Sequence, residues 1–380
     1  AVLETSPIPM DMPIYSPADQ EVYQVADRMM LVPDVAGVYM VEAVVQTDGG
    51  EIVLGADVTG ANYVGVGVVN DPNWTSASYP QCALCHAWDP DGKVESYMGT
   101  GHATFLEEAI DGIKSSHYGS YCLDCHVLGG HAPDADNGNF ASVAEHVGWT
   151  FPEVLEPGNW DAMPLELKEK ANIQCEHCHG AGSEHHGIKE TISVSLNSGD
   201  CAQCHDEEPY HNKNRQWALS GHAVATRYPT GSERRSGCVK CHSGIGFIQD
   251  MDGIIDDEKS VEYEAIVCAA CHDPHTNHGD NHQLRSTEDI AFENGHVVTE
   301  GGNGKFCLNC HKARRNAEEY VQGSVSSHYG PRYGNQGNHF HGRNANALGR
   351  EVCGPWINQN AVEASGVGCH VQPVGRDERA

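Results

Sequence analysis

The sequence predicts a mostly irregular, loop-rich chain with short α-helices, preceded by a small β-sandwich-like domain at the N-terminus. Three observations support this fold class. Residues 1 to 75 contain no Cys or His and hold several β-branched runs. Beyond them, the motif Cys-x-x-Cys-His recurs along the chain, and Gly and Pro are abundant, at 42 and 18 residues. We therefore expect a β domain at 1–75 and a second domain at 76–380 that is organised around the repeated motif.

The β domain is predicted from three runs that are rich in β-branched residues and separated by turn residues. The runs cover residues 38–45, 51–54 and 63–69, with Asp-Gly-Gly and Thr-Gly-Ala-Asn between them. Short strands punctuated in this way are typical of a sandwich of immunoglobulin-like type. Such a domain could stabilise the chain as a cap, or it could dock to another subunit or to the cell surface.

The second domain is predicted from seven regular Cys-x-x-Cys-His motifs and one stretched copy, numbered 1 to 8 along the chain. The attachment cysteines are Cys82, Cys85, Cys122, Cys125, Cys175, Cys178, Cys201, Cys204, Cys238, Cys241, Cys268, Cys271, Cys307, Cys310, Cys353 and Cys369. The adjoining histidines are His86, His126, His179, His205, His242, His272, His311 and His370. This pattern attaches haem c through two thioethers, and the His supplies one axial ligand to iron.

Eight covalently bound haems would use all 16 cysteines. Zinc ribbons or disulfides are the alternative for the set, but zinc sites do not require a His directly after each cysteine pair. The eighth motif is open to another interpretation, because fifteen residues separate Cys353 from Cys369. There the alternative is an ordinary disulfide with His370 as a bystander.

Eight haems in 380 residues leave about 48 residues for each (380/8). We expect that the porphyrins themselves form most of the core and that only short helices connect the motifs. Apolar spacing favours helices near residues 105–113, 165–171 and 312–321. Gly-His-Ala occurs at 101–103 and 221–223, and Ser-Ser-His-Tyr-Gly at 115–119 and 326–330. These repeats indicate an array that arose by duplication.

The formal charge is -30, and eight ferric haems with ionised propionates bring it to roughly -38. Nucleic acid and anionic membranes are therefore poor partners, whereas basic proteins, divalent cations and mineral surfaces are suitable. The acidic run at 256–258 could bind calcium, although solvated carboxylates are the default there. No apolar run is long enough for a membrane-spanning helix. Because haem is attached outside the cytoplasm, we expect an exported, soluble protein whose signal peptide has been cleaved, located extracellularly, at the cell surface or in the periplasm.

Histidines also supply candidates for the second axial ligand. Of 24 His, eight belong to the motifs, so 16 remain (24 - 8). A His just downstream of a motif cannot easily reach the far face of its own haem, but it can reach a neighbouring one. The favoured distal ligands are His102, His117, His131, His185, His222, His275, His296 and His328. Solvated or hydrogen-bonding roles are favoured for His146, His177, His186, His211, His278, His282, His339 and His341. We interpret the methionines as packing residues.

Several segments resemble known multihaem proteins. Cys201–Ala223, with Trp217, Ser220 and His222, is similar to the tetrahaem cytochromes of ammonia oxidisers and their relatives. Cys-His-Gly-Ala-Gly-Ser-Glu-His at 178–185 and Cys-His-Asp-Pro-His at 271–275 match patterns of the same superfamily. The resemblance covers short motifs within residues 80–311, and it implies that His185, His222 and His275 are distal ligands.

Seven regular motifs and one stretched motif in an acidic, exported chain also resemble the extracellular cytochrome filaments, or nanowires, of metal-reducing microbes. That resemblance implies assembly with other copies of the chain, in which His117 or the segment 328–341 would supply a ligand to the next subunit. It also implies redox partner proteins, metal oxides or other extracellular acceptors as electron partners.

Two main functions are compatible with this pattern. The first is electron transfer through eight haems, each ligated by two histidines, so that no iron is open to a substrate. The second is a reductase of nitrite, hydroxylamine or a sulfur oxyanion, which needs one open iron; the stretched motif resembles that of octahaem sulfite reductases. No motif ends in Lys, as the nitrite-reductase active haem requires, and we therefore expect an electron-transfer protein rather than an enzyme. A monomeric periplasmic carrier is a third alternative.

Overall fold

The computed structural model describes residues 2–5, 13–15, 22–24, 29–66, 81–87, 90–115, 117–206, 211–218, 220–223, 240–253, 265–277, 282–316, 319–320, 322–323 and 337–338. The chain divides into two compact units. Unit 1 contains Ala1–Met10, Ala26–His211 and Pro274–Asn277, and unit 2 contains Asp11–Val25, Asn212–Asp273 and His278–Ala380. The predicted acidic calcium site at 256–258 lies outside the described residues.

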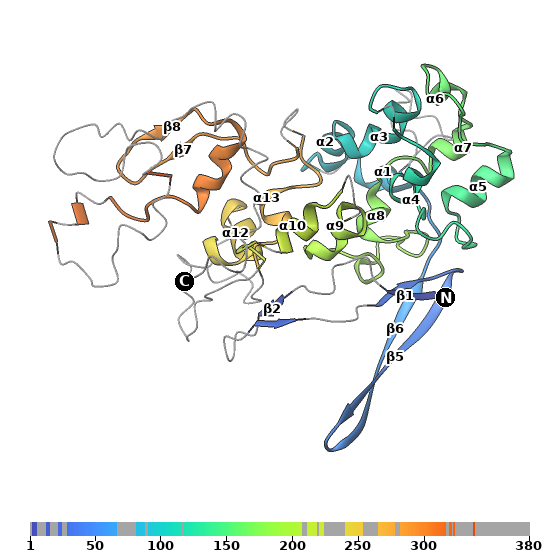
Figure 1. Cartoon of the computed structure of the whole chain (residues 1–380), viewed down its shortest axis with the longest axis horizontal. Coiled ribbons are helices and arrows are strands. Elements are labelled where there is room, and N and C mark those ends of the chain that lie inside the picture. The colour runs from blue at the N-terminus through green and yellow to red at the C-terminus, as the bar shows by residue number, and fades with distance from the viewer. Residues whose placement is uncertain are drawn as a thin grey trace. The chain divides into compact units, whose positions relative to one another are not determined.

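The principal β element of unit 1 is a hairpin of two 11-residue antiparallel strands, β5 (Gly37–Thr47) and β6 (Gly50–Gly60). It includes the predicted runs at 38–45 and 51–54. Figure 1 shows it as a long blue ribbon that extends away from the helices of the same unit. A shorter pair joins β1 (Val2–Thr5) to β4 (Met29–Val32). Each sheet among the described residues has two strands, so the immunoglobulin-like sandwich stays a prediction.

The third predicted strand is not formed at residues 63–66, because the backbone there is bonded elsewhere. The Tyr63 N–H donates to the Asn137 carbonyl at 2.8 Å, and the Val64 N–H donates to the Glu176 carboxylate at 2.9 Å. Contacts with the segment between motifs 2 and 3 and with motif 3 itself thus replace the ladder that a strand would need. Residues 67–69 lie outside the described part of the chain.

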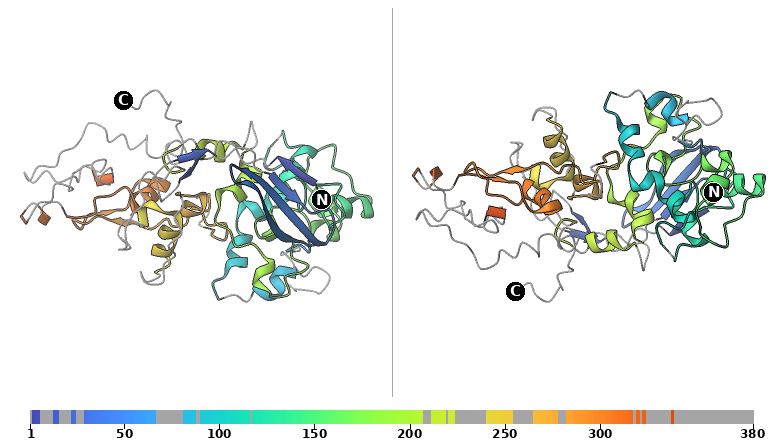
Figure 2. Two further views of the ribbon diagram at one scale, coloured as in Figure 1. Left: turned by 90° about the horizontal axis from the view of Figure 1, so that it is seen from below. Right: turned by 90° about the horizontal axis from the view of Figure 1, so that it is seen from above.

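Short helices make up most of the rest of unit 1. They are α1 (Gln81–His86), α2 (Lys93–Met98), α3 (Gly101–Ile110), α4 (Leu123–His126), α5 (Phe140–Val147), α6 (Asn159–Ala162), α7 (Leu165–Lys168), α8 (Cys175–His179) and α9 (Ser198–His205), with 3-10 turns η1 (Ser120–Cys122) and η2 (Lys189–Thr191). Figure 2 shows the cyan and green helices of this unit clustered together in both views. Helix α5 begins at Asn139, whose side chain accepts the Ser142 N–H, and ends at Gly148 in the left-handed region.

An apolar core lies between α3, α5 and α7, where the sequence led us to expect little besides porphyrin. It contains Leu106, Ile110, Phe140, Met163 and Leu167, all at most 3% exposed. The interval between motifs 2 and 3 is the longest among the regular motifs, and it supplies enough chain for conventional packing. This core fixes the backbone on which motif 2 is carried.

Unit 2 has fewer regular elements among its described residues. They are the strand pairs β2 (Pro13–Tyr15) with β3 (Val22–Gln24) and β7 (Ile290–Ala291) with β8 (Val297–Val298), the helices α10 (Lys213–Ala218), α12 (Gly244–Met251) and α13 (Cys268–Cys271), and the 3-10 segment η4 (Gly302–Asn309). The helix predicted at 312–321 is wrong for residues 312–316, where the Ala313 N–H donates to the Asn338 side chain at 2.7 Å. None of the described helices combines the length and the apolarity that a bilayer crossing demands.

Candidate haem-binding sites

Several of the described motifs lie on short helices, and the helical repeat accounts for the spacing of their two cysteines and the His. Motifs 1, 3 and 4 form the C-terminal ends of helices α1, α8 and α9, respectively. Their cysteines occupy helical positions i and i+3, and the His occupies position i+4. These positions share one face of a helix. Both sulfurs and the imidazole can therefore meet the same porphyrin, which is what covalent attachment and axial ligation together require. Cys238 of motif 5 and all of motif 8, Cys353, Cys369 and His370, lie outside the described residues.

Among the described residues, six pairs of histidine rings join a motif His to a His outside the motifs. One of them, His205–His211 at 6.1 Å, shares each of its rings with another pair, which leaves five pairs with no ring in common. Their ring centres are 6.0 to 6.3 Å apart, and the pairs are His86–His185, His102–His205, His126–His211, His179–His275 and His222–His311. Two imidazoles on opposite sides of one iron have about the same separation, since each Fe–N bond is about 2 Å and the nitrogen lies about 1 Å from its ring centre. The spacing fits an iron between the two rings of each pair.

Hydrogen bonds at the Nδ1 atoms leave the Nε2 atoms of several of these rings for iron. His179 Nδ1 lies 2.6 Å from the Ser193 carbonyl, and His185 Nδ1 lies 3.0 Å from the Ile188 carbonyl. A carbonyl can only accept, so Nδ1 carries the proton and Nε2 keeps its lone pair. Ring orientation and tautomer are thus set by the backbone, as is usual for metal-bound histidine.

His177, inside motif 3, shows the opposite pattern. Its Nδ1 accepts the Gln174 N–H at 2.9 Å, and its Nε2 lies 3.0 Å from the Val127 carbonyl, to which it donates. Burial lowers the pKa of His177 to about 4, so the ring is neutral near pH 7. With both nitrogens bonded to the protein, His177 braces motif 3 against the chain that follows motif 2, in agreement with its predicted hydrogen-bonding role.

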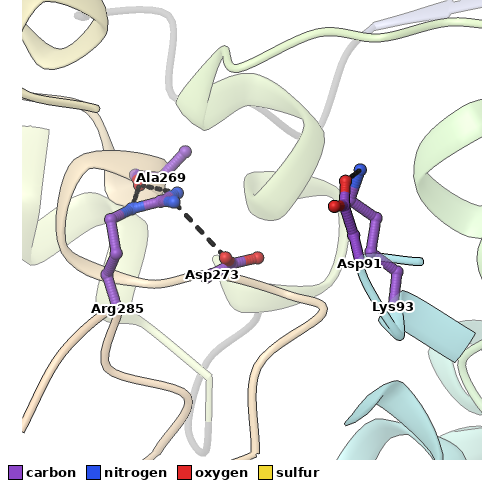
Figure 3. A network of polar contacts seen from close by, with 5 residues as sticks. All are labelled: Asp91, Lys93, Ala269, Asp273 and Arg285. Carbon is purple, nitrogen blue, oxygen red and sulfur yellow. Dashed lines mark hydrogen bonds and ion pairs between the residues drawn. The ribbon is translucent and has the colours of Figure 1, made fainter. Parts of the chain in front are cut away.

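Buried and paired charges fix two of the motifs. The Glu176 carboxylate, 3% exposed, accepts the N–H groups of Gly65 at 2.6 Å and Gly182 at 2.7 Å, and burial raises its pKa. In unit 2, Figure 3 shows the Arg285 guanidinium directed at the Asp273 carboxylate, 3.3 Å away, and at the Ala269 carbonyl, 2.8 Å away. Ala269 lies within motif 6, so this arginine holds one end of the motif helix.

The structure places four of the eight predicted distal ligands opposite a motif His: His102, His185, His222 and His275. It adds His211, for which the sequence favoured a solvated role. The available signal was spacing, because His211 follows the His of motif 4 by six residues, as His185 follows the His of motif 3.

Three further predicted ligands have other neighbours, and their ligation stays a prediction. His131 Nε2 lies 4.0 Å from the sulfurs of Cys125 and Cys204, His117 Nδ1 lies 2.7 Å from Ser115 Oγ, and the His296 ring centre lies 5.8 Å from that of Phe292. His328 lies outside the described residues.

Known proteins with similar sequences were sought, and no family model or solved structure matches the chain. The C-type polyheme cytochrome OmcB of Geobacter sulfurreducens, in two strains, is 28% identical over 166 residues, which are 37% of this chain and 21% of OmcB. These similarities support a multihaem c-type cytochrome. The dissimilatory sulfite reductase MccA of Wolinella succinogenes is 25% identical over 214 residues, 52% of this chain and 28% of MccA. The matched parts thus span less than a third of either relative.

The hydrogen bond to the His of motif 2 can be tested directly. The Nδ1 of His126 in motif 2 lies 3.0 Å from the hydroxyl of Tyr118, and the two rings stack with centres 5.4 Å apart. Tyr118 is 8% exposed, and burial raises its pKa, so the phenol stays protonated. A hydroxyl that accepts from Nδ1–H increases the electron density on the ligating nitrogen.

We expect Tyr118→Phe to raise the midpoint potential of the haem of motif 2 and to leave the other potentials within error. Potentiometric titration of the haem-loaded protein measures this. Tyr121→Phe is the control, since Tyr121 is 63% exposed and its hydroxyl donates to the His117 carbonyl. A shift of equal size in both variants would show that the Tyr118 hydroxyl has no specific effect on His126.

Proposed function

We propose that this protein transfers electrons through eight c-type haems, each held between two histidines. The five ring pairs 6.0 to 6.3 Å apart carry this proposal, because each combines a motif His with a second His. Bound haem supplies the one-electron Fe(III)/Fe(II) couple. The chain's own contribution is to occupy both axial positions, to fix the imidazole tautomers and to surround the macrocycles with short helices.

His211 illustrates how the pairing is assigned. Its ring centre is 6.2 Å from that of His126 and 6.1 Å from that of His205. The first assignment is favoured, because His211 follows motif 4 directly and the far side of that haem is already faced by His102, 6.1 Å from His205. His211 would then complete the site of motif 2.

We further propose that the protein acts outside the cell and assembles with copies of itself into a conducting filament. The similarity to the polyheme cytochrome OmcB supports an electron-transfer role, although it covers 37% of the chain. The exposed apolar side chains of the hairpin β5–β6, including Val45, Ile52 and Leu54 at 43 to 59% exposure, support a subunit contact. A monomeric periplasmic carrier is the alternative without assembly.

A sulfur-oxyanion reductase is the second candidate, and two observations favour it. The chain is similar to a dissimilatory sulfite reductase over 214 residues, and its eighth motif has fifteen residues between the two cysteines. Reduction of sulfite at iron would require one haem with an open axial position. The five closed pairs argue against such a position at motifs 1, 2, 3, 4 and 7.

Spectroscopy of the haem-loaded protein distinguishes these functions. For electron transfer we expect eight low-spin haems per chain by mass and by electron paramagnetic resonance (EPR), with no spectral change when sulfite, nitrite or hydroxylamine is added. A high-spin ferric signal that responds to sulfite would instead support the reductase. Fewer than eight haems by mass spectrometry would refute the count.

A further inference from the structure

In unit 1, two hydrogen bonds link the segment around His102, a predicted distal ligand, to the residues just before motif 3. Motif 3 is the middle one of motifs 2, 3 and 4. Tyr97 donates its hydroxyl to the Ile173 carbonyl at 2.7 Å, and the Ile173 N–H donates to the His102 carbonyl at 3.1 Å. Ile173 lies two residues before Cys175 of motif 3. The His102 ring faces His205 of motif 4, with ring centres 6.1 Å apart.

Unit 2 contains the same contacts with different residues. Trp217 donates its indole N–H to the Ile266 carbonyl at 2.8 Å, and the Ile266 N–H donates to the His222 carbonyl at 3.1 Å. Ile266 lies two residues before Cys268 of motif 6, and the His222 ring faces His311 of motif 7 at 6.0 Å. In both units the aromatic residue precedes the histidine by five positions. Two unrelated local folds would not reproduce this order of residues and bonds, so the agreement indicates duplication.

The attachment cysteines show the same correspondence. In unit 1 the sulfurs of Cys125 and Cys204, the second cysteines of motifs 2 and 4, lie within 4.8 Å of each other. In unit 2 the sulfur of Cys310, the second cysteine of motif 7, lies 3.7 Å from the carbonyl oxygen of Lys240, which directly precedes Cys241, the second cysteine of motif 5. The first and last motifs of each stretch therefore meet beside their second cysteines.

We propose that the chain contains two copies of a three-haem module, formed by motifs 2–4 and motifs 5–7, in which the first and third haems contact each other directly. Each sulfur is bonded to the edge of its porphyrin, so two neighbouring sulfurs bring two porphyrin edges together. Electrons would then pass between haems 2 and 4, and between haems 5 and 7, without crossing the haem that lies between them in the sequence. This inference rests on the proposed electron-transfer function and specifies its internal path.

Electron cryomicroscopy of the haem-loaded protein tests the module. We expect porphyrin edges of haems 2 and 4 in van der Waals contact, about 4 Å apart, and the same arrangement at haems 5 and 7. A map in which haem 3 separates haems 2 and 4, or in which the two modules differ, would overturn the inference. The same map shows whether each iron has two histidines, so the ligation proposal succeeds or fails independently.

A magnetic experiment tests the contact in solution. His102→Met is expected to raise the potential of haem 4, because a Met ligand favours the ferrous state. At a potential where haem 4 alone is reduced and diamagnetic, the ferric EPR signal of haem 2 should lose its coupling and sharpen. Tyr118→Phe in the same background identifies that signal as the signal of haem 2.

His185→Met provides the matched comparison, because it makes the same chemical change opposite His86 at haem 1. We expect it to leave the haem 2 signal as it was. An unaltered haem 2 signal in His102→Met, or equal sharpening in both variants, would contradict direct contact between haems 2 and 4.

Discussion

A protein carrying His185→Asn is expected to gain one high-spin haem per chain that binds carbon monoxide, where the parent protein binds none. His185 faces His86 with ring centres 6.3 Å apart and planes within 14°. Its Nδ1 is held by the Ile188 carbonyl at 3.0 Å, so Nε2 is directed to the iron position. Asn cannot replace this nitrogen, and the iron of motif 1 becomes five-coordinate.

The adjacent residue provides a matched control. His186 is exposed and adopts φ 40°, a backbone conformation that Asn tolerates better than most residues. His186→Asn makes the same chemical change one position away, and we expect its absorption, EPR spectrum and carbon monoxide binding to equal those of the parent. If His185→Asn also stays fully low-spin, the assignment of His185 to motif 1 is wrong, and with it the use of ring separation to identify ligands.

The attachment motifs can be recognised in the sequence because they depend on neighbouring positions. In motifs 1, 3 and 4 the two sulfurs and the imidazole occupy helical positions i, i+3 and i+4 and so share one helix face. The distal ligands depend on contacts between distant positions: His86 and His185 are 99 residues apart (185 - 86), and His126 and His211 are 85 apart (211 - 126). Spacing predicted that a His downstream of a motif serves another haem, but it could not indicate which one.

Local pattern also predicted the hairpin but not the end of the β region. Residues 38–45 and 51–54 are rich in β-branched residues on either side of an Asp-Gly-Gly turn, and they pair with each other in one two-stranded ladder. The run at 63–69 looks similar in sequence, yet Tyr63 and Val64 bond to Asn137 and Glu176, more than 70 residues away. The buried Glu176 carboxylate, which no sequence pattern marks as an anchor, accepts the N–H groups of Val64 and Gly65 instead.

One face of the hairpin carries no charged side chain and is apolar apart from Thr47 and the Tyr39 hydroxyl. Cross-strand pairing places Tyr39 opposite Val58, Val41 opposite Ala56, Ala43 opposite Leu54 and Val45 opposite Ile52, all on the same side of the ribbon. Ile52 and Leu54 are 48% and 59% exposed. A chain with net charge -30 repels its own copies over most of its surface. This uncharged strip is where two copies can approach, and burying it would also stabilise a hairpin that is marginal by itself.

Leu54→Lys is therefore expected to abolish self-assembly while leaving the haem spectrum unaltered. Losing a buried Leu costs about 1.5 to 3 kcal/mol for each copy in a contact, and burying the new ammonium adds to that cost. Gln46→Lys is the control, because this substitution adds the same charge on the opposite face of the ribbon, where Gln46 pairs with Glu51. Electron microscopy and light scattering should show filaments for the parent and for Gln46→Lys, and single chains for Leu54→Lys. Filaments in all three proteins would exclude the apolar face as the contact. Single chains in all three would refute assembly, because even the parent protein would then leave its apolar strip exposed to solvent.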